Sequence, residues 1–162
     1  MQQRIINRVE GDPHYHRYLQ SFDPPTDGSS AAAIIVAARQ IARSTNAKAI
    51  VSFTVGGTTA QRASKKRPDV PILAISPLLE TSRQLAMSWG VYPEYASDDS
   101  YDTDNFRDML RAACDIALKK GLVADPNDLL VVTAGFPFGT PGAANIIRVI
   151  PAAGPSHWDS SL

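Results

Sequence analysis

Two glycine-containing loops carry the residues of this 162-residue chain that are best suited to chemistry. The first, residues 53–60, reads Phe-Thr-Val-Gly-Gly-Thr-Thr-Ala and leads from an apolar segment into a helical one. Glycines let a backbone approach a ligand closely, threonine hydroxyls can hydrogen-bond to it, and a helix N-terminus adds partial positive charge. The loop therefore suits a phosphate or sulfate group. Its expected contacts are Thr54, Gly57, Thr58 and Thr59.

A simpler interpretation of this loop stays open. Gly56 and Gly57 can merely make a tight turn between a strand and a helix, with Thr58 as the cap of that helix. The loop is neither a P-loop nor a dinucleotide-binding glycine motif, and nucleotide binding does not follow from it.

The second loop, residues 133–142, reads Thr-Ala-Gly-Phe-Pro-Phe-Gly-Thr-Pro-Gly. Phe136 and Phe138 would face water in an open loop, so the segment can fold over a ligand as a lid. The alternative is a rigid, hairpin-like connection in which both rings pack down. The residues expected at the ligand are Gly135, Gly139, Thr140 and Gly142.

Other reactive side chains have structural interpretations. His14 and His16 lack an acid or cysteine at ligand spacing, which favours a surface role over a metal site. Four aspartates between residues 98 and 104 precede a helix, and Asp104 suits a cap there. Cys114 lies mid-helix and is expected in the core, whereas residues 65–67 form a basic, solvated helix end. The chain thus looks like a binding domain, without a metal site or a catalytic set.

Composition narrows the class of protein. Sixteen basic and sixteen acidic residues give zero net charge, so no positive field exists to gather nucleic acid or a membrane surface. The longest apolar run, residues 31–38, is too short to cross a bilayer, and the N-terminus lacks a signal-peptide core. One cysteine excludes an internal disulfide and fits a reducing compartment. We expect a soluble, cytoplasmic protein.

Hydrophobic periodicity predicts alternating strands and helices, which is typical of an α/β domain in three layers. The expected strands are 49–53, 71–75, 91–96, 129–133 and 145–150. The expected helices are 4–10, 14–21, 29–43, 58–67, 77–88 and 104–120. Residues 134–144 are too few and too rich in glycine and proline for a crossover helix, so the fifth strand should run antiparallel to the fourth.

Segments that disfavour regular structure, together with changes in the sequence pattern, divide the chain into three parts. Residues 1–26 form a helical appendage, and its boundary with the next part falls within residues 23–28, Asp-Pro-Pro-Thr-Asp-Gly, which disfavour a helix. Residues 27–151 hold the regular α/β pattern. Residues 152–162 carry no pattern and are expected to be a loose tail.

Several segments, in order and at the right spacing, resemble the C-terminal domain of pyruvate kinase, and bacterial, particularly proteobacterial, members resemble it most. These segments are residues 47–54, 64–68, 71–76, 89–93, 128–135 and 139–145. The resemblance covers about residues 27–151 and implies the sheet order 3-2-1-4-5. It also implies that residues 1–26 are a remnant of the preceding barrel domain and linker.

In that family the whole enzyme transfers a phosphoryl group from phosphoenolpyruvate to ADP with Mg²⁺ and usually K⁺. Its catalytic residues lie in the barrel domain, so this chain alone is expected to be inactive. The resemblance further implies a regulatory, oligomerising domain in which the loop after strand one binds the phosphate of a sugar-phosphate effector. By motif position the phosphate-binding residues are Thr54, Val55, Gly56, Gly57 and Thr59.

Three points remain open from the sequence. Gly56 stands where most relatives have serine. A monophosphate effector or a loss of regulation is therefore as plausible as a bisphosphate effector. If the effector has a second phosphate, Arg107 and Arg111 are the nearby cations that could bind it. The last strand, residues 145–150, is an apolar edge that should pair with a second copy. A free-standing phospho-metabolite-binding domain and an independent enzyme acting at the same cleft are the alternative functions.

Overall fold

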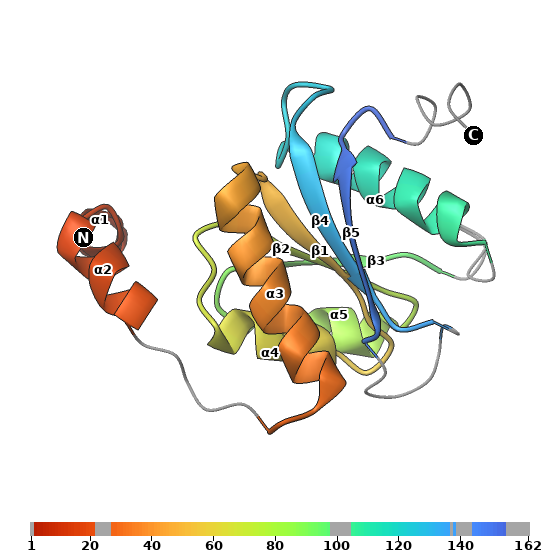
Figure 1. The fold of residues 1–162 in the computed structure, drawn as a ribbon, viewed down its shortest axis with the longest axis horizontal. Coiled ribbons are helices and arrows are strands. Elements are labelled where there is room, and N and C mark those ends of the chain that lie inside the picture. Colours follow the sequence, from red (N-terminus) through yellow and green to blue (C-terminus); the bar gives the residue numbers. More distant parts are fainter. Residues whose placement is uncertain (1, 22–26, 98–104, 137, 139–143, 155–162) are drawn as a thin grey trace.

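The computed structural model describes residues 2–21, 27–97, 105–136, 138 and 144–154 (Figure 1). Its helices are α1 (Gln2–Glu10), α2 (Pro13–Ser21), α3 (Ser30–Thr45), α4 (Thr58–Lys65), α5 (Leu79–Leu85) and α6 (Phe106–Lys119). Its strands are β1 (Ala49–Phe53), β2 (Ile72–Ser76), β3 (Val91–Tyr95), β4 (Leu129–Ala134) and β5 (Ile146–Pro151). The predicted order of elements is confirmed, with shifts of a few residues at their ends.

The strands form one sheet in the order β3-β2-β1-β4-β5, as predicted. The first four are parallel, and β5 runs antiparallel to β4. Val51 in the central strand faces Leu73 on one side and Val132 on the other. Because β1 and β2 are buried along their whole length, both read as continuous apolar runs in the sequence.

Successive strand residues point to opposite faces of the sheet, and each face is covered by helices (Figure 1). Val51 and Phe53 pack with Leu110 of α6 on one face. On the other face, Ile72 packs with Ile35 of α3. The sheet is therefore the middle of three layers, and the loops that follow its strands lie at the edges of the sheet, where helices do not cover it.

The starts of α6 and α5 depart from the sequence-based expectation for reasons that single hydrogen bonds explain. Helix α6 is capped by Asn105, whose Oδ1 accepts the N–H groups of Arg107 (3.0 Å) and Asp108 (3.4 Å). Asp104, the expected cap, lies outside the described residues. Helix α5 begins at Leu79 and not at residue 77, because the Ser76 hydroxyl accepts the Leu78 N–H at 3.2 Å and Leu78 is extended.

The packed domain also continues past residue 151. Ala152 is 1% exposed, and its N–H donates to the Asp128 carbonyl at 2.7 Å. The Ala153 N–H donates to the Pro126 carbonyl at 2.8 Å. The expected loose tail therefore does not include residues 152–154, and residues 155–162 lie outside the described part of the chain.

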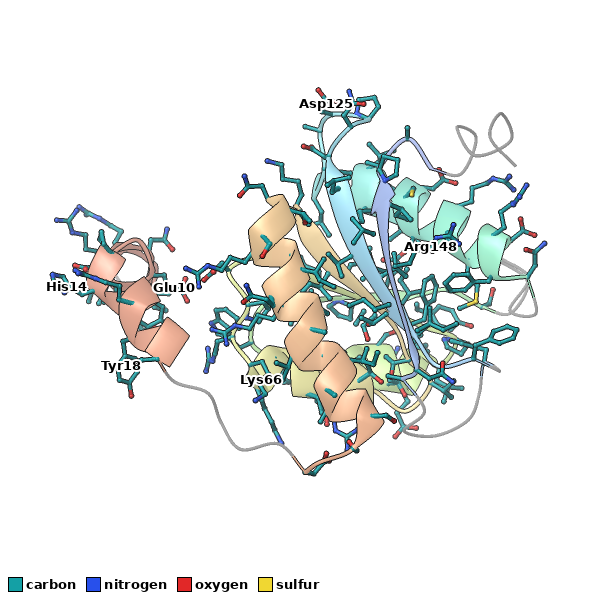
Figure 2. All side chains as sticks on the ribbon, in the orientation of Figure 1. Glu10, His14, Tyr18, Lys66, Asp125 and Arg148 are labelled. Atoms are coloured by element: carbon teal, nitrogen blue, oxygen red, sulfur yellow. The ribbon has the colours of Figure 1, made fainter. Side chains whose placement is uncertain are left out.

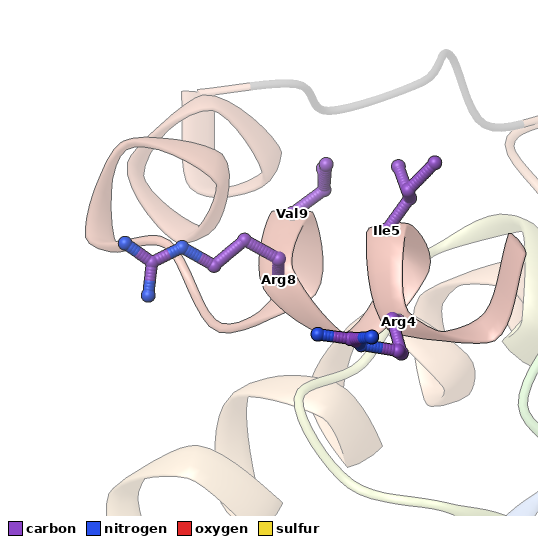
Figure 3. Close-up of a pocket in the computed structure, with 4 residues that line it drawn as sticks. All are labelled: Arg4, Ile5, Arg8 and Val9. Atoms are coloured by element: carbon purple, nitrogen blue, oxygen red, sulfur yellow. The ribbon is translucent and has the colours of Figure 1, made fainter. Parts of the chain in front are cut away.

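Helices α1 and α2 form a separate pair beside the domain (Figure 1). The predicted apolar stripe of α1 is real, but Ile5 and Val9 are 59% and 48% exposed. Together with Arg4 and Arg8 they line an open groove of about 550 Å³ (Figure 3). In the part of the chain that the structure describes, no helix has the length and apolar character needed to cross a bilayer.

Candidate anion-binding site

The loop after β1 lies where the chain order of the sheet reverses. From β1 the chain continues to β2 on one side, whereas β4 pairs with β1 on the other. Ligands of open α/β sheets bind beyond the carboxyl ends of the strands at such a point. Both glycine-containing loops that the sequence singled out start at this edge, one after Phe53 and one after Ala134.

Hydrogen bonds hold the first loop in a fixed turn. The Thr54 N–H donates to the Ile75 carbonyl at 3.0 Å, which continues the ladder between β1 and β2. The Gly57 N–H then donates to Thr54 Oγ1 at 3.0 Å. From β2, the Ser76 hydroxyl donates to the Val55 carbonyl at 3.3 Å. The loop backbone is therefore set before any ligand arrives.

Gly56 and Gly57 have different reasons to be glycine. Gly57 has a φ of +79°, and a Cβ there would lie 3.3 Å from Thr81 Cγ2 and 3.4 Å from Leu85 Cδ2. Gly56 is exposed, and a Cβ at this position would meet no atom within 4 Å. The turn therefore needs glycine only at position 57, and position 56 can accept a side chain.

Helix α4 begins without a side-chain cap. Its N-cap is Gly57, so Thr58 is not the cap that the simpler interpretation of the loop assumed. The first intrahelical bond runs from the Gln61 N–H to the Gly57 carbonyl at 3.0 Å. The N–H groups of residues 58–60 precede it, and such first-turn groups have no acceptor within their own helix. An anion at this end could receive them and would also be favoured by the helix dipole.

The threonines of the loop are not equally accessible. Thr58 is exposed, whereas Thr54 and Thr59 are only 6% and 8% exposed. The hydroxyl of Thr54 is already an acceptor inside the turn. The surface open to a ligand is therefore formed by Gly56, Thr58 and the part-buried Val55, and a large or charged replacement at Thr59 would disturb the core.

The start of the second loop is anchored by Asn145. Its Oδ1 accepts the Phe136 N–H at 2.9 Å, and its Nδ2 donates to the Phe136 carbonyl at 2.7 Å. Phe138 packs edge-on against Phe53, with ring centroids 6.3 Å apart. Phe136 remains 42% exposed, so one ring is packed down and the other is not. Gly135 is part-buried; Gly139, Thr140 and Gly142 lie outside the described residues.

Sequence reasoning missed the role of Asn145. The sequence places Asn145 as the first residue of the last strand, whereas the strand begins at Ile146. The Asn145 amide instead makes two hydrogen bonds to the Phe136 backbone, as one further residue pair of the ladder would. A hint was available, because asparagine carries a donor and an acceptor in a single planar group.

Arginines on α4 and α6 are paired with carboxylates. Arg62 of α4 pairs with Asp27 at 2.8 Å, ahead of α3. On α6, Arg111 pairs with Asp108 at 3.0 Å. Arg107 and Arg111 lie on the helix that covers the opposite face of the sheet from α4, and their role toward a second phosphate stays a prediction. Recognition in the first loop would rest on N–H groups and hydroxyls.

The structure also shows the surroundings of the other reactive side chains that the sequence analysis considered. Cys114 is 2% exposed, and burial raises the pKa of its thiol to about 11, which keeps it protonated at neutral pH. Lys66 is only 8% exposed, so residues 65–67 are not a simple solvated helix end. The His14 N–H donates to Asp12. Within the described ranges, no three His, Cys, Asp or Glu side chains are grouped to hold a metal ion.

Comparisons with known proteins converge on one family. The family model described as "Pyruvate kinase, alpha/beta domain" matches residues 32–150. A pyruvate kinase of Agrobacterium vitis is 39% identical over 149 residues, which cover 92% of this chain and 30% of the relative. One of Methylorubrum extorquens is 35% identical over 146 residues, covering 90% and 30%.

Solved structures agree with these sequence matches. A pyruvate kinase from Cryptosporidium parvum in complex with ADP superposes with a TM-score of 0.68 and 26% identity. The match covers 85% of this chain and 26% of that structure's chain. The chain thus spans about a third or less of the length of the proteins it matches.

Proposed function

Because the chain belongs to the pyruvate kinase alpha/beta domain family, we propose that it is the regulatory part of an enzyme that transfers a phosphoryl group from phosphoenolpyruvate to ADP. The resemblance seen in the sequence motifs is confirmed, and bacterial relatives are among the matches. What the domain does within that enzyme is inferred from the loop after β1.

The proposed activity of the domain is binding of a sugar-phosphate effector. The observation that carries this proposal is the start of α4, an eight-residue helix with no side-chain cap at the switch point of the sheet. Its first-turn N–H groups and the exposed Thr58 hydroxyl offer donors to a phosphate without a formal cation. The proposed phosphate site is the loop formed by Thr54, Val55, Gly56, Gly57, Thr58 and Thr59, in which Val55, Gly56 and Thr58 are accessible and the buried Thr54, Gly57 and Thr59 shape the turn. The proposed sugar contacts are Gly135, Gly139, Thr140 and Gly142.

Calorimetric titration of the chain tests this proposal. Ribose 5-phosphate, glucose 6-phosphate and fructose 1,6-bisphosphate serve as ligands, and inorganic sulfate serves as the bare anion. We expect at least one sugar phosphate to bind at submillimolar concentration. The proposal is wrong if none of the three sugar phosphates binds at millimolar concentration.

A charge placed at the mouth of the loop localises the binding. Thr58→Glu puts a carboxylate beside the expected phosphate and should weaken binding at least tenfold, since like charges repel strongly at a partly desolvated site. Thr58 is preferable to the buried Thr59 for this test because its replacement leaves the core intact. Gln40→Glu on α3 adds the same charge at an exposed position and should leave the affinity unchanged.

The remaining properties of the enzyme are proposed for the whole protein. Phosphoryl transfer would be carried out by catalytic residues outside this chain, with Mg²⁺ and K⁺ bound there, in the cytoplasm. A coupled assay with phosphoenolpyruvate and ADP should therefore detect no turnover by the 162-residue chain. Turnover above background would favour the alternative of an independent enzyme.

We also propose that a second copy of the chain pairs along β5. This strand is an edge of the sheet, with Ile146 and Ile147 half-buried and Val149 38% exposed. An uncovered edge of this kind can extend its ladder across a two-fold axis. Light scattering should find a mass above that of a monomer, falling on dilution, and Val149→Lys should shift it toward the monomer.

A further inference from the structure

Trp89 lies at the centre of three contacts at the amino-terminal edge of the sheet, just before β3. Its indole Nε1–H donates to Glu10 Oε1, with an N–O distance of 3.3 Å. The guanidinium carbon of Arg67 lies 4.5 Å from the centroid of its ring. Its backbone carbonyl accepts the Ser64 hydroxyl at 2.7 Å. The indole ring therefore contacts Arg67, which follows α4, and Glu10, the last residue of α1, while Ser64 of α4 holds the Trp89 backbone.

The contact with Glu10 joins segments that are far apart in the sequence. Glu10 ends α1 and lies on the side of the helical pair that faces the domain (Figure 2). Burial of apolar surface does not fasten the pair to the domain at α1, because Ile5, Ile6 and Val9 are all about half exposed or more. A polar attachment point therefore matters more here than it would for a helix docked by its apolar stripe.

Arg67 occupies a backbone conformation that few residues adopt. Its φ is +47°, in the left-handed region, directly after Lys66 at the end of α4. Glycine is the usual residue at this position because it carries no Cβ penalty. An arginine here keeps the strained backbone and places its guanidinium over Trp89. Strain combined with a specific side-chain contact points to a role for the contact.

The two charged partners reinforce one another through the indole. A carboxylate that accepts the ring N–H polarises the ring and makes its face more negative. A more negative face attracts the guanidinium more strongly. Removing either charge should therefore weaken both contacts.

We propose that Glu10, Trp89 and Arg67 form a latch that fastens the N-terminal helical pair, residues 2–21, to the α/β domain. Opening the latch releases this pair while the domain stays folded. The latch lies at the opposite edge of the sheet from the anion-binding loop, at the other end of α4, and does not depend on the proposed effector.

Trypsin and Trp89 fluorescence test the latch in the 162-residue chain. Trp158→Phe leaves Trp89 as the only tryptophan, so its emission and acrylamide quenching report on this site alone. In that background, Glu10→Ala and Arg67→Gly should each raise the rate of cleavage after Arg8 and Arg17 about fivefold. Trp89 emission should shift to the red and quenching should increase, whereas the Tm of the domain should change little.

Matched variants separate the latch from general effects. Arg67→Lys keeps a cation over the ring and should cleave more slowly than Arg67→Gly, although Arg67→Gly has the more relaxed backbone. Glu80→Ala removes an exposed carboxylate from α5 and should leave both readouts unchanged. The latch is ruled out if Glu10→Ala and Arg67→Gly leave cleavage and emission as they are, or if Glu80→Ala changes them equally.

Discussion

The N-termini of α3 and α4 are closed in different ways. At α3, the Ser29 hydroxyl accepts the Ala32 N–H at 3.2 Å, and Asp27 accepts the Ser29 N–H at 3.0 Å. At α4, the N-cap is Gly57, which has no side chain to bond to the first turn. The chain thus satisfies one helix end with its own side chains and leaves the other, at the switch point of the sheet, open to an external anion.

The two ends are also linked by an ion pair. Arg62, one turn inside α4, reaches Asp27 ahead of α3 with a separation of 2.8 Å. Arg62, the cation closest in sequence to the N-terminus of α4, is therefore paired with a carboxylate at the N-terminus of α3. An anion at the start of α4 would therefore have to be held by backbone N–H groups and hydroxyls, as proposed above.

Gly57→Ala should have the largest effect on stability. The substitution forces an alanine to a φ of +79° and brings its Cβ to 3.3 Å from Thr81 Cγ2. We expect the free energy of unfolding in urea to fall by about 2–3 kcal/mol. Gly56→Ala is the control and should change it by less than about 0.5 kcal/mol, because this Cβ has open space. Equal losses for both variants would contradict the assigned turn.

Ser29→Ala should come second, because it removes the side-chain cap of α3. Loss of such a cap costs about 1 kcal/mol, measurable by urea unfolding. Ser30 is exposed and lies inside the first turn, so Ser30→Ala should have little effect. If Ser30→Ala were the more destabilising change, the cap would have been assigned to the wrong residue.

Asp27→Asn should have a smaller, pH-dependent effect. Hydrogen bonds from the Ser29 side chain and backbone, with the charge of Arg62, lower the pKa of Asp27 below the ordinary aspartate value of 3.8. A carboxyl with a lowered pKa stabilises the fold above its unfolded pKa. The stability difference between wild type and Asp27→Asn should thus be constant near neutral pH and shrink as the pH falls below about 3.8.

Salt separates the two contributions at Asp27. In 1 M NaCl the Debye length is about 3 Å, so attraction to Arg62 is screened while the hydrogen bonds from Ser29 remain. A difference that survives in high salt is expected. Its complete loss would show that the ion pair alone stabilises this end. Asp128, whose pKa is lowered by the Asp125 and Ala124 N–H groups, titrates in both proteins and cancels.

Much of the fold could be predicted from the sequence because buried strands and helices require apolar residues at regular spacings. Strands β1 and β2 are buried throughout and read as apolar runs. The segment between β4 and β5 is too short and too rich in glycine and proline to form a crossover helix, and from this the antiparallel direction of β5 was predicted. Helix ends were less predictable, because Asn105 and Ser76 act through single hydrogen bonds that leave no periodic signal.

The candidate site could be located from the sequence but not described in detail. The glycines and threonines of residues 53–60 indicated which loop to consider. The sequence does not reveal, however, that the Thr54 hydroxyl accepts the Gly57 N–H or that Thr59 is buried. Both depend on how α4 lies against β2 and α5. The contact of Arg67 with Trp89 was missed for the same reason, since three basic residues in a row favour a solvated helix end.

Gly56→Ser should have the smallest effect on stability and sharpens the assignment of the open helix end. Gly56 is exposed, its φ is not in the left-handed region, and its Cβ position is free, so serine fits without rearrangement. The added hydroxyl would lie beside the first turn of α4. One more neutral hydrogen bond to a phosphate should tighten sugar-phosphate binding about threefold to tenfold by calorimetry. Gly56→Ala stiffens the loop equally but adds no donor; if it tightens binding as much as serine does, the gain comes from the backbone and not from the hydroxyl.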